Sequence, residues 1–480
     1  MKTPKLVTQA FCVINILILI IGFCGVAGAQ DQQTVKKLQQ LIEQQQKQLE
    51  AQQKALRDLK NRVETLATEE AVVEVQAAQA ERLAEEAVKK AQAAKAEADR
   101  AHREAIAVDI ENEEDLHRTK GKSFHIPDTK TVLTLSGFIK ADVIHDFDKI
   151  QSPYKFVAKD IVVDGQPSGQ PSSRTTLTAN ASRFIAASAT PTDYGKLSTF
   201  LSFDFAGNTT SSDPDLRFRQ GWGQLDDFFW GGGLRVGQSW SSWDDLAALP
   251  ETMDFEGPNG SQQNRQTLVR WARDFQDKYT LWVAVENPDY SIEGGKAKSA
   301  WPDTIVSLKW HGDWGHLKPA LIGRQLRGDS DDGGNDTAFG WGTQLAGILN
   351  VPLLAKKDNF SFQAVYGAGI GSYNNDGFDD AVFDGSNLKA IKSFQGYGAF
   401  QHWWTDSLRS NAVFGYVDLD NRSVQSDDTF ERSMYFAGNL VWSPIKQMDI
   451  GAEYLWGQRD NKNGATGTAR RMQLSTKFTF

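Results

Sequence analysis

The sequence predicts an all-β transmembrane barrel of about 16 antiparallel strands, preceded by an N-terminal α-helical coiled coil. Three observations lead to this fold class. Apolar and polar residues alternate from residue 131 onward, the chain ends in an alternating aromatic strand, and no aromatic residue occurs between Gln30 and Ser123. The mean hydropathy of -0.45 excludes a bundle of membrane helices. The chain therefore has two parts of different kinds.

Residues 1–29 have the order of a secretory signal peptide. Two lysines come first, an apolar run follows over residues 11–21, and Ala27-Gly28-Ala29 ends the segment. The alternative is an uncleaved inner-membrane anchor. Both cysteines of the chain, Cys12 and Cys24, lie in this segment. After cleavage, the protein would have no disulfide and no thiolate metal site.

Residues 30–107 follow one heptad register, which predicts a left-handed coiled coil in the periplasm. Val35, Ile42, Leu49 and Leu56 take position a, and the register continues through an alanine-rich half. At about 1.5 Å per residue the helix would extend roughly 100 Å. A lone helix would expose its apolar seam, so the pattern implies oligomerisation. The alternative is a polar, partly disordered segment.

Residues 108–130 break the heptad and read as a linker, and residues 131–480 as the barrel. In the first strand Leu135, Ile139 and Val143 face one way and Lys140 the other. Phe138 departs from this division and is expected to point inward. Pro319 lies inside a later predicted strand, where we expect a β-bulge.

The last strand shows the alternation most clearly. Its lipid face is predicted to carry Met472, Leu474, Thr476, Phe478 and Phe480, with Lys477 on the lumenal face. The strand is expected to close the sheet against the first one. A terminal strand that ends in Phe also resembles the signal bound by the outer-membrane assembly machinery, so outer-membrane lipid and that machinery are expected partners.

Composition and motifs exclude several functions. The net charge of -9 and the isoelectric point near 5.4 argue against a nucleic-acid partner. No HExxH, Walker or G-x-S-x-G motif is present, so we expect neither an enzyme nor a cofactor. The acidic loop at residues 328–336 departs from EF-hand spacing, with Gly333 where a ligand is needed. It is interpreted as a solvated external loop, with no metal site.

Several basic residues alternate with apolar neighbours and are therefore expected to face the lumen. An arginine on the lipid face at mid-bilayer would cost about 2 to 4 kcal/mol. The alternative is that each cation pairs with a lumenal carboxylate and only satisfies the wall. The predicted pore-lining residues are Arg183, Arg217, Arg219, Arg235, Arg270, Lys309 and Lys477.

Residues 241–262 contain Pro250, Gly257, Pro258 and Gly260, a composition that excludes a strand. This segment is expected either to fold into the barrel as a constriction loop or to form an ordinary external loop. In the first case Glu251, Asp254 and Glu256 would lie opposite the arginines. Acid facing base across a pore would create a transverse field that favours polar solutes.

Three blocks of sequence carry a family resemblance. They are LTLSGFIKADVIHDFD, LPETMDFEGPNGS and NLVWSPIKQMDIGAEYLWGQRD, beginning at Leu133, Leu249 and Asn439. Together with the predicted coiled coil, they resemble the DcaP-like family of trimeric outer-membrane porins over essentially the whole chain. The resemblance implies a homotrimer in the outer membrane with its coil in the periplasm, and passive uptake of small anions such as dicarboxylates. The alternatives are a phosphate-selective-type porin and a structural barrel that tethers the envelope.

Overall fold

The computed structural model describes residues 32–65, 81–95, 97 and 121–480, apart from residues 167, 209, 210 and 299. The predicted signal peptide lies outside the described residues. The chain divides into two compact units, Met1–His102 and Arg103–Phe480. Among the described residues, no helix is both long enough and apolar enough to span a membrane.

The first unit contains the helix α2 (Gln32–Thr65) and a second helical run over residues 81–95. Leu49 and Leu56, both at position a of the predicted heptad, are 39% and 42% exposed. The helix therefore leaves its apolar seam open within the single chain. Parts of the predicted coil, residues 30–31, 66–80, 96 and 98–107, lie outside the described residues, and the coiled coil itself stays a prediction.

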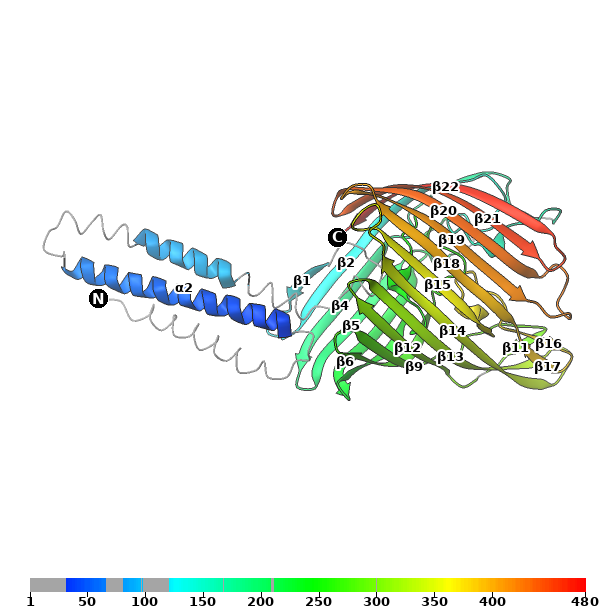
Figure 1. Ribbon diagram of the computed structural model, residues 1–480, viewed down its shortest axis with the longest axis horizontal. Helices are drawn as coiled ribbons and strands as arrows, with labels where there is room; N and C mark the ends of the chain where they lie inside the picture. The colour runs from blue at the N-terminus through cyan, green and yellow to red at the C-terminus, as the bar shows by residue number, and fades with distance from the viewer. Residues whose placement is uncertain are drawn as a thin grey trace. The chain divides into compact units, whose positions relative to one another are not determined.

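The second unit is a closed barrel, as the alternation predicts (Figure 1). Each strand pairs antiparallel with the next, and β22 pairs with β2 to close the ring. Within residues 121–480, as far as they are described, sixteen strands form the wall: β2 (Val132–Asp146), β4 (Arg183–Thr192), β5 (Gly195–Asp204), β6 (Arg217–Phe229), β7 (Gly232–Trp240), β8 (Arg265–Phe275), β9 (Tyr279–Glu286), β12 (Asp303–Gly312), β13 (Gly315–Ser330), β14 (Asn335–Asn350), β15 (Asn359–Ala368), β18 (Lys392–Trp403), β19 (Leu408–Asp420), β20 (Phe430–Ile445), β21 (Met448–Asn461) and β22 (Thr466–Thr479).

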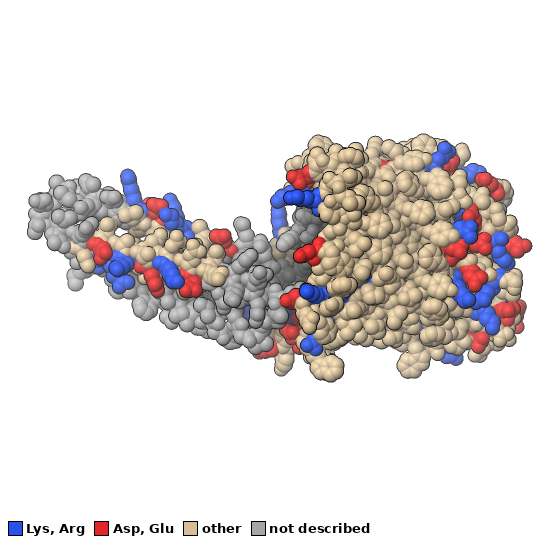
Figure 2. All heavy atoms as spheres, viewed as in Figure 1, with Lys and Arg blue, Asp and Glu red and all other residues tan. Residues whose placement is uncertain are grey.

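Side chains alternate between the two faces of this wall. On β2, Ile139 is 59% exposed on the outer face, whereas its neighbours Lys140 and Phe138 are buried inside. Figure 2 shows the result on the outer face: charged side chains gather near the two rims, and the band between them is almost free of charge. This is the surface that a barrel presents to hydrocarbon.

The two ends of the barrel differ. One end, called here the short-turn end, contains tight connections such as residues 193–194 between β4 and β5. The opposite end, the long-loop end, contains the extended connections, in which short extra strands and 3-10 helices form. These are β3 (Arg174–Thr178), β10 (Ile292–Glu293), β11 (Gly295–Ala297), β16 (Ala381–Asp384), β17 (Asn387–Ala390), η1 (Ala158–Asp160) and η3 (Gly371–Tyr373).

The seam between β2 and β22 is completed by a further strand. Phe480 exchanges two backbone hydrogen bonds with Gly137, of 3.0 and 3.2 Å, and β22 reaches no farther along β2. The edge of β2 beyond this point pairs with β1 (Lys122–His125). The described part of the predicted linker, residues 121–130, therefore contains a strand that the sequence pattern did not indicate.

The bulge expected at Pro319 is absent, and that prediction is wrong. Pro319 pairs with Leu345 of β14 in unbroken register. On its other side, Pro319 faces β12. The pairs Ser307↔Ala320 and Trp310↔Leu317 are formed, the positions between them are unpaired, and the register is the same before and after this gap. Proline lacks the N–H group that a ladder bond needs. The missing N–H group of Pro319 is therefore accommodated by a gap in the ladder between β12 and β13, without a bulge.

Candidate functional site

Residues 241–264, which connect β7 to β8, form a loop that folds into the barrel. We call this segment the inner loop. Its first part contains the 3-10 helix η2 (Leu246–Ala248) and Trp243, which is fully buried among apolar side chains of the wall. Gly257 and Gly260 have φ values of 75° and 76°, which favour glycine. A Cβ on Gly260 would lie 2.6 Å from the Gly396 nitrogen, so the backbone approaches the wall closely there.

Polar side chains of the wall hold the beginning of the inner loop. Gln344 donates a hydrogen bond of 2.7 Å to the carbonyl oxygen of Trp243. A ring nitrogen of His316 lies 2.7 Å from a carboxylate oxygen of Asp245. Both wall residues come from neighbouring strands, β14 and β13. The loop therefore follows the inner surface of the wall from its first residues onward.

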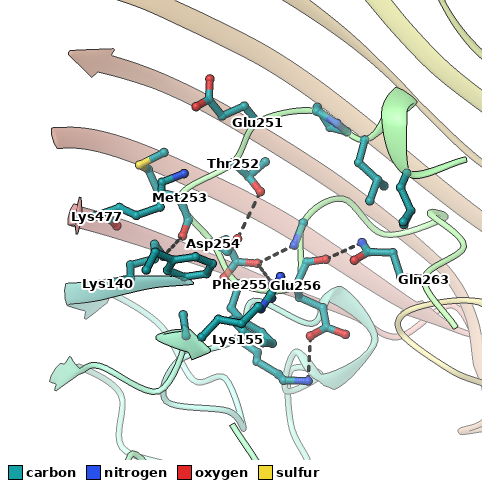
Figure 3. Close-up of a pocket in the computed structure, with 18 of the residues that line it drawn as sticks. Lys140, Lys155, Glu251, Thr252, Met253, Asp254, Phe255, Glu256, Gln263 and Lys477 are labelled. Atoms are coloured by element: carbon teal, nitrogen blue, oxygen red, sulfur yellow. Dashed lines mark hydrogen bonds and ion pairs between the residues drawn. The ribbon is translucent and has the colours of Figure 1, made fainter. Parts of the chain in front are cut away.

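The tip of the inner loop is held by a second group of wall residues, of which Figure 3 shows Lys140 next to Met253. The buried carboxylate of Glu453 accepts hydrogen bonds from the amides of Met253 and Asp254, at 3.0 and 2.7 Å. The carbonyl oxygen of Met253 accepts bonds from Lys140 at 2.6 Å and Gln473 at 2.7 Å. Both polar groups of the Met253 backbone are thus satisfied by the wall, so the loop tip has a defined position.

The inner loop and the wall at β2, β4, β6 and β22 enclose a cavity of about 210 Å³. Four of the predicted cations, Arg183, Arg217, Arg219 and Lys477, line it. So do all three predicted loop carboxylates, Glu251, Asp254 and Glu256. The structure thus brings these seven residues together around one space.

Asp204 of β5 holds two of these arginines. Its carboxylate lies 2.6 Å from Arg217 Nη2 and 2.7 Å from Arg219 Nη1. Arg217 and Arg219 lie two positions apart on β6 and face inward on either side of the exposed Phe218, and the register shift at Arg219 turns the next residue, Gln220, inward as well. One carboxylate is thus shared by two guanidinium groups, and this part of the wall has an excess of positive charge.

Aromatic rings separate the cations that line the cavity. Each of three rings lies within 6 Å of two positive side chains, in the range of cation–π attraction. The pairs are Arg217 and Lys155 over Phe255 at 5.3 and 5.5 Å, Arg183 and Lys477 over Phe138 at 5.2 and 5.9 Å, and Arg219 and Arg265 over Trp240 at 5.5 and 4.5 Å. These rings keep like charges apart and hold their side chains in place.

The other three predicted cations lie outside this cavity. Arg235 is buried, with its guanidinium 3.6 Å from the ring centre of Trp222 and a 2.8 Å hydrogen bond to Gln224. Arg270 pairs with Arg235 across β7 and β8, and Lys309 lies on β12. All three alternate with outward apolar residues, but they belong to the wall nearer the short-turn end.

The loop carboxylates do not simply face the arginines across the cavity, which differs from the expected arrangement. Glu251 pairs with Arg409 of β19. Asp254 accepts a 3.0 Å bond from the amide of Phe156 and is only 4% exposed. Glu256 lies 2.8 Å from Lys155. A carboxylate buried against the wall needs such partners because an unpaired buried charge is costly.

The pKa of the Asp254 carboxyl also differs from its ordinary value. Burial raises the pKa of Asp254 to about 6, with Glu256 adding to the effect and Arg471 opposing it. The Asp254 carboxylate is directed to the Phe156 amide and to Arg471, which lies 3.5 Å away, so the acidic side of the expected transverse field is engaged by other groups. The cations of the cavity are the more prominent charges.

Several residues of the site were not among the predicted ones. Alternation placed Lys140 on the inner face without marking it as a site residue, and it could have identified Arg409 and Arg471 in the same way, since each lies on an inward position of a strand. Lys155 and Arg265 had no such signal. Lys155 belongs to a long connection, and Arg265 is the first residue of β8, where the pattern begins.

The family comparison decides what kind of barrel this is. The model of the DcaP outer membrane protein family matches residues 75–480. The chain belongs to this family. As a DcaP-family barrel, it is an outer membrane protein of a channel family.

The first of three similar solved structures agrees with this assignment at the level of the fold. The outer membrane channel DcaP of Acinetobacter baumannii is 21% identical, with a TM-score of 0.66, over 74% of this chain and 99% of that chain. OmpT of Vibrio cholerae is 12% identical, with a TM-score of 0.48 over 74% and 99% of the two chains. The anion-selective porin from Comamonas acidovorans is 13% identical, with a TM-score of 0.48 over 73% and 100%. No curated protein matches this DcaP-family chain in sequence.

Proposed function

We propose that this DcaP-family barrel is a passive channel that prefers small anions such as dicarboxylates, and not an enzyme. One observation supports the proposal: four of the predicted cations line the cavity beside the inner loop, while the loop carboxylates have partners of their own. Arg217 and Arg219 share the single carboxylate of Asp204, which leaves positive charge on this side. A ring of basic side chains favours anions in a pore.

The inner loop sets the narrowest part of the channel in this proposal. Its tip is held by Glu453 and Lys140, so the opening has a defined size. The predicted pore-lining residues Arg235, Arg270 and Lys309 contribute to the lumenal potential below the constriction. The channel needs no cofactor and no metal, because diffusion involves no bond chemistry.

The proposed assembly is a homotrimer in outer-membrane lipid, with the short-turn end in the periplasm. Short periplasmic turns and longer external loops are the rule for such barrels. Residues 30–107 would form a periplasmic coiled coil, for which the open seam at Leu49 and Leu56 is the supporting observation. The last strand, ending at Phe480, would be the segment recognised by the assembly machinery.

The test is ion selectivity in planar bilayers. A double variant, Arg183→Gln with Lys477→Gln, removes two cations that line the cavity over Phe138. Its reversal potential in a salt gradient should move toward cation preference. Arg270→Gln, an inward arginine outside the cavity, is the matched control and should move it less. Cation preference in the unmodified protein, or no conductance at all, would exclude the proposal.

Solute preference is tested by liposome swelling with succinate, phthalate, phosphate and glucose in parallel. Faster swelling with the dicarboxylates than with glucose is expected. Swelling with phosphate alone would favour a phosphate-selective channel instead.

A further inference from the structure

One ion pair of the cavity joins two connections of the chain. Lys155 lies in the connection between β2 and β3, residues 147–173, and Glu256 lies in the inner loop. Their charged groups are 2.8 Å apart, and both side chains are 13% exposed and line the cavity (Figure 3). We call these two residues the gate pair. Because the connection between β2 and β3 belongs to the long-loop end, the gate pair borders the cavity on that side.

The backbone on both sides of the gate pair is fixed by one buried carboxylate. Asp254 accepts hydrogen bonds from three nearby amides, those of Phe156 at 3.0 Å, Glu256 at 3.0 Å and Gly257 at 3.1 Å. The Phe156 side chain is 1% exposed and packs among apolar side chains of the wall. The two connections therefore keep their separation, and the side chains of the gate pair are the part that can move.

The lysine of the gate pair has a second attraction within the cavity. Its charge lies on a flexible four-carbon stem, with the Lys155 ammonium group 5.5 Å from the ring centre of Phe255. The Arg217 guanidinium lies 5.3 Å from the same ring centre and is held by Asp204 at 2.6 Å. If Glu256 moved away, Lys155 would keep its attraction to the ring. It would then present its charge to the cavity beside Arg217.

We infer, on the basis of the proposed channel function, that the gate pair is opened by the solute itself. A carboxylate of an entering solute replaces the Glu256 carboxylate on the Lys155 ammonium group, and Glu256 turns into the cavity. The lysine keeps an anionic partner throughout, so the exchange avoids the cost of an unpaired charge. A neutral solute of the same size has no charge to offer and meets the closed pair. The second carboxylate of a dicarboxylate binds Arg217 on the same ring.

Glu256 also provides a way for the solute to leave. Conduction requires a site that binds well enough to admit a solute and weakly enough to release it. The Glu256 carboxylate stays tethered beside Lys155 and competes for its ammonium group. Its return displaces the solute toward the other cations of the cavity, Arg183 and Lys477.

The experiment measures two properties of the full-length protein. They are liposome swelling with succinate and with glucose, and the reversal potential in a potassium chloride gradient. Glu256→Gln removes the ion pair and one negative charge with little change in side-chain size. Glucose swelling should become faster, so the ratio of succinate to glucose swelling rates should fall, while the reversal potential shifts toward stronger anion preference. A purely electrostatic role of Glu256 would raise both preferences together.

The matched control removes a different carboxylate of the cavity. Asp449 lines the cavity from the wall, 3.5 Å from Lys477, and does not belong to the gate pair. Asp449→Asn should shift the reversal potential toward anions as Glu256→Gln does, and glucose swelling should stay at the rate of the unmodified protein.

Two further variants test the pair from its other side. Lys155→Gln should also make glucose swelling faster. Lys155→Glu with Glu256→Lys forms the pair again with exchanged charges and should return glucose swelling toward the unmodified rate. Gel mobility with and without heating verifies that each variant is folded, and Lys155→Gln tests the gate even if Glu256→Gln does not fold.

Three outcomes would overturn the inference. They are unchanged glucose swelling in both single variants of the gate pair, equally fast glucose swelling in Asp449→Asn, and no slowing of glucose swelling in the variant with exchanged charges. Each of them is compatible with a channel that prefers anions. Failure of the proposed function would appear instead as cation preference or absent conductance in the unmodified protein, so the two failures are distinguishable.

Discussion

The carboxylate of Glu453 on β21 accepts a 2.7 Å hydrogen bond from the backbone amide of Asp254 at the tip of the inner loop. The same carboxylate accepts a second hydrogen bond, from the backbone amide of Met253. Two consecutive loop amides thus donate to one buried wall residue, which holds the tip of the inner loop together with Lys140 and Gln473.

Replacing Glu453 should loosen the loop. Glu453→Ala leaves two buried amides without their acceptor, at about 1–3 kcal/mol each. We expect larger and noisier single-channel conductance and faster swelling with larger solutes. Asp420→Ala, which removes an exposed carboxylate at the end of β19, is the control. Unchanged conductance in Glu453→Ala would show that other contacts hold the loop tip.

Neutralising Asp204 should have two opposite effects. Asp204→Asn removes the carboxylate shared by Arg217 and Arg219, so anion preference should increase in reversal-potential measurements. The same change removes the negative charge that Arg217 and the buried Arg219 share, and breaking a buried pair costs about 3 to 5 kcal/mol. The barrel should therefore unfold at a lower temperature in gel-shift melts. A decrease in anion preference would contradict the proposed role of these arginines.

The packing of two connections at the long-loop end should depend on pH through Asp376. Its carboxylate accepts a 3.2 Å bond from the amide of Lys159 of η1, and Glu256 and Asp160 contribute negative charge nearby. Burial, followed by Glu256, raises the pKa of Asp376 to about 7. An acid whose pKa is raised in the folded state stabilises that state less as pH increases. The loss begins near the ordinary value of about 4 and is complete near 7.

Hydrogen exchange near Lys159 at pH 5 and pH 8 measures this effect. The amides should exchange more readily at pH 8, after correction for the intrinsic pH dependence of exchange. Asp376→Asn, which cannot ionise, should abolish the difference. If the difference persists in this variant, another group is responsible.

Closure of the barrel should depend on Gly137. A Cβ at this position would lie 2.3 Å from the carbonyl oxygen of Arg183 and 2.9 Å from the ring of Phe480. Gly137→Val should therefore disturb the seam and reduce the yield of folded, heat-modifiable protein. At Gly223 a Cβ would lie 4.0 Å from its nearest neighbour, so Gly223→Ala serves as the tolerated control. Equal yields from both variants would contradict a special role for Gly137.

The alternation of apolar and polar residues predicted the strands of the wall well, because the face that a residue takes depends only on its position along the strand. An outward residue such as Ile139 meets lipid and an inward neighbour such as Lys140 does not, whatever the rest of the fold does. The short strands β3, β16 and β17 were not predicted. They lie in long connections where no lipid face imposes a period of two.

The candidate site was predictable only in part for a related reason. Alternation places Arg217 on the inner face, but it does not indicate which carboxylate meets it. The pairing of Glu251 with Arg409 joins residues 158 positions apart, and it depends on the path of the inner loop. Proline and glycine spacing excluded a strand there, but it could not supply the partners along that path.

The strand β1, which completes the edge of β2 beyond Phe480, has a practical consequence for handling the protein. The last residue ends inside a hydrogen-bonded seam, with its carbonyl oxygen also accepting a 3.1 Å bond from the Ser136 hydroxyl. An affinity tag fused after Phe480 would have to leave the sheet where β1 already occupies the edge. A tag inserted in the turn at residues 462–465, between β21 and β22, avoids this crowding.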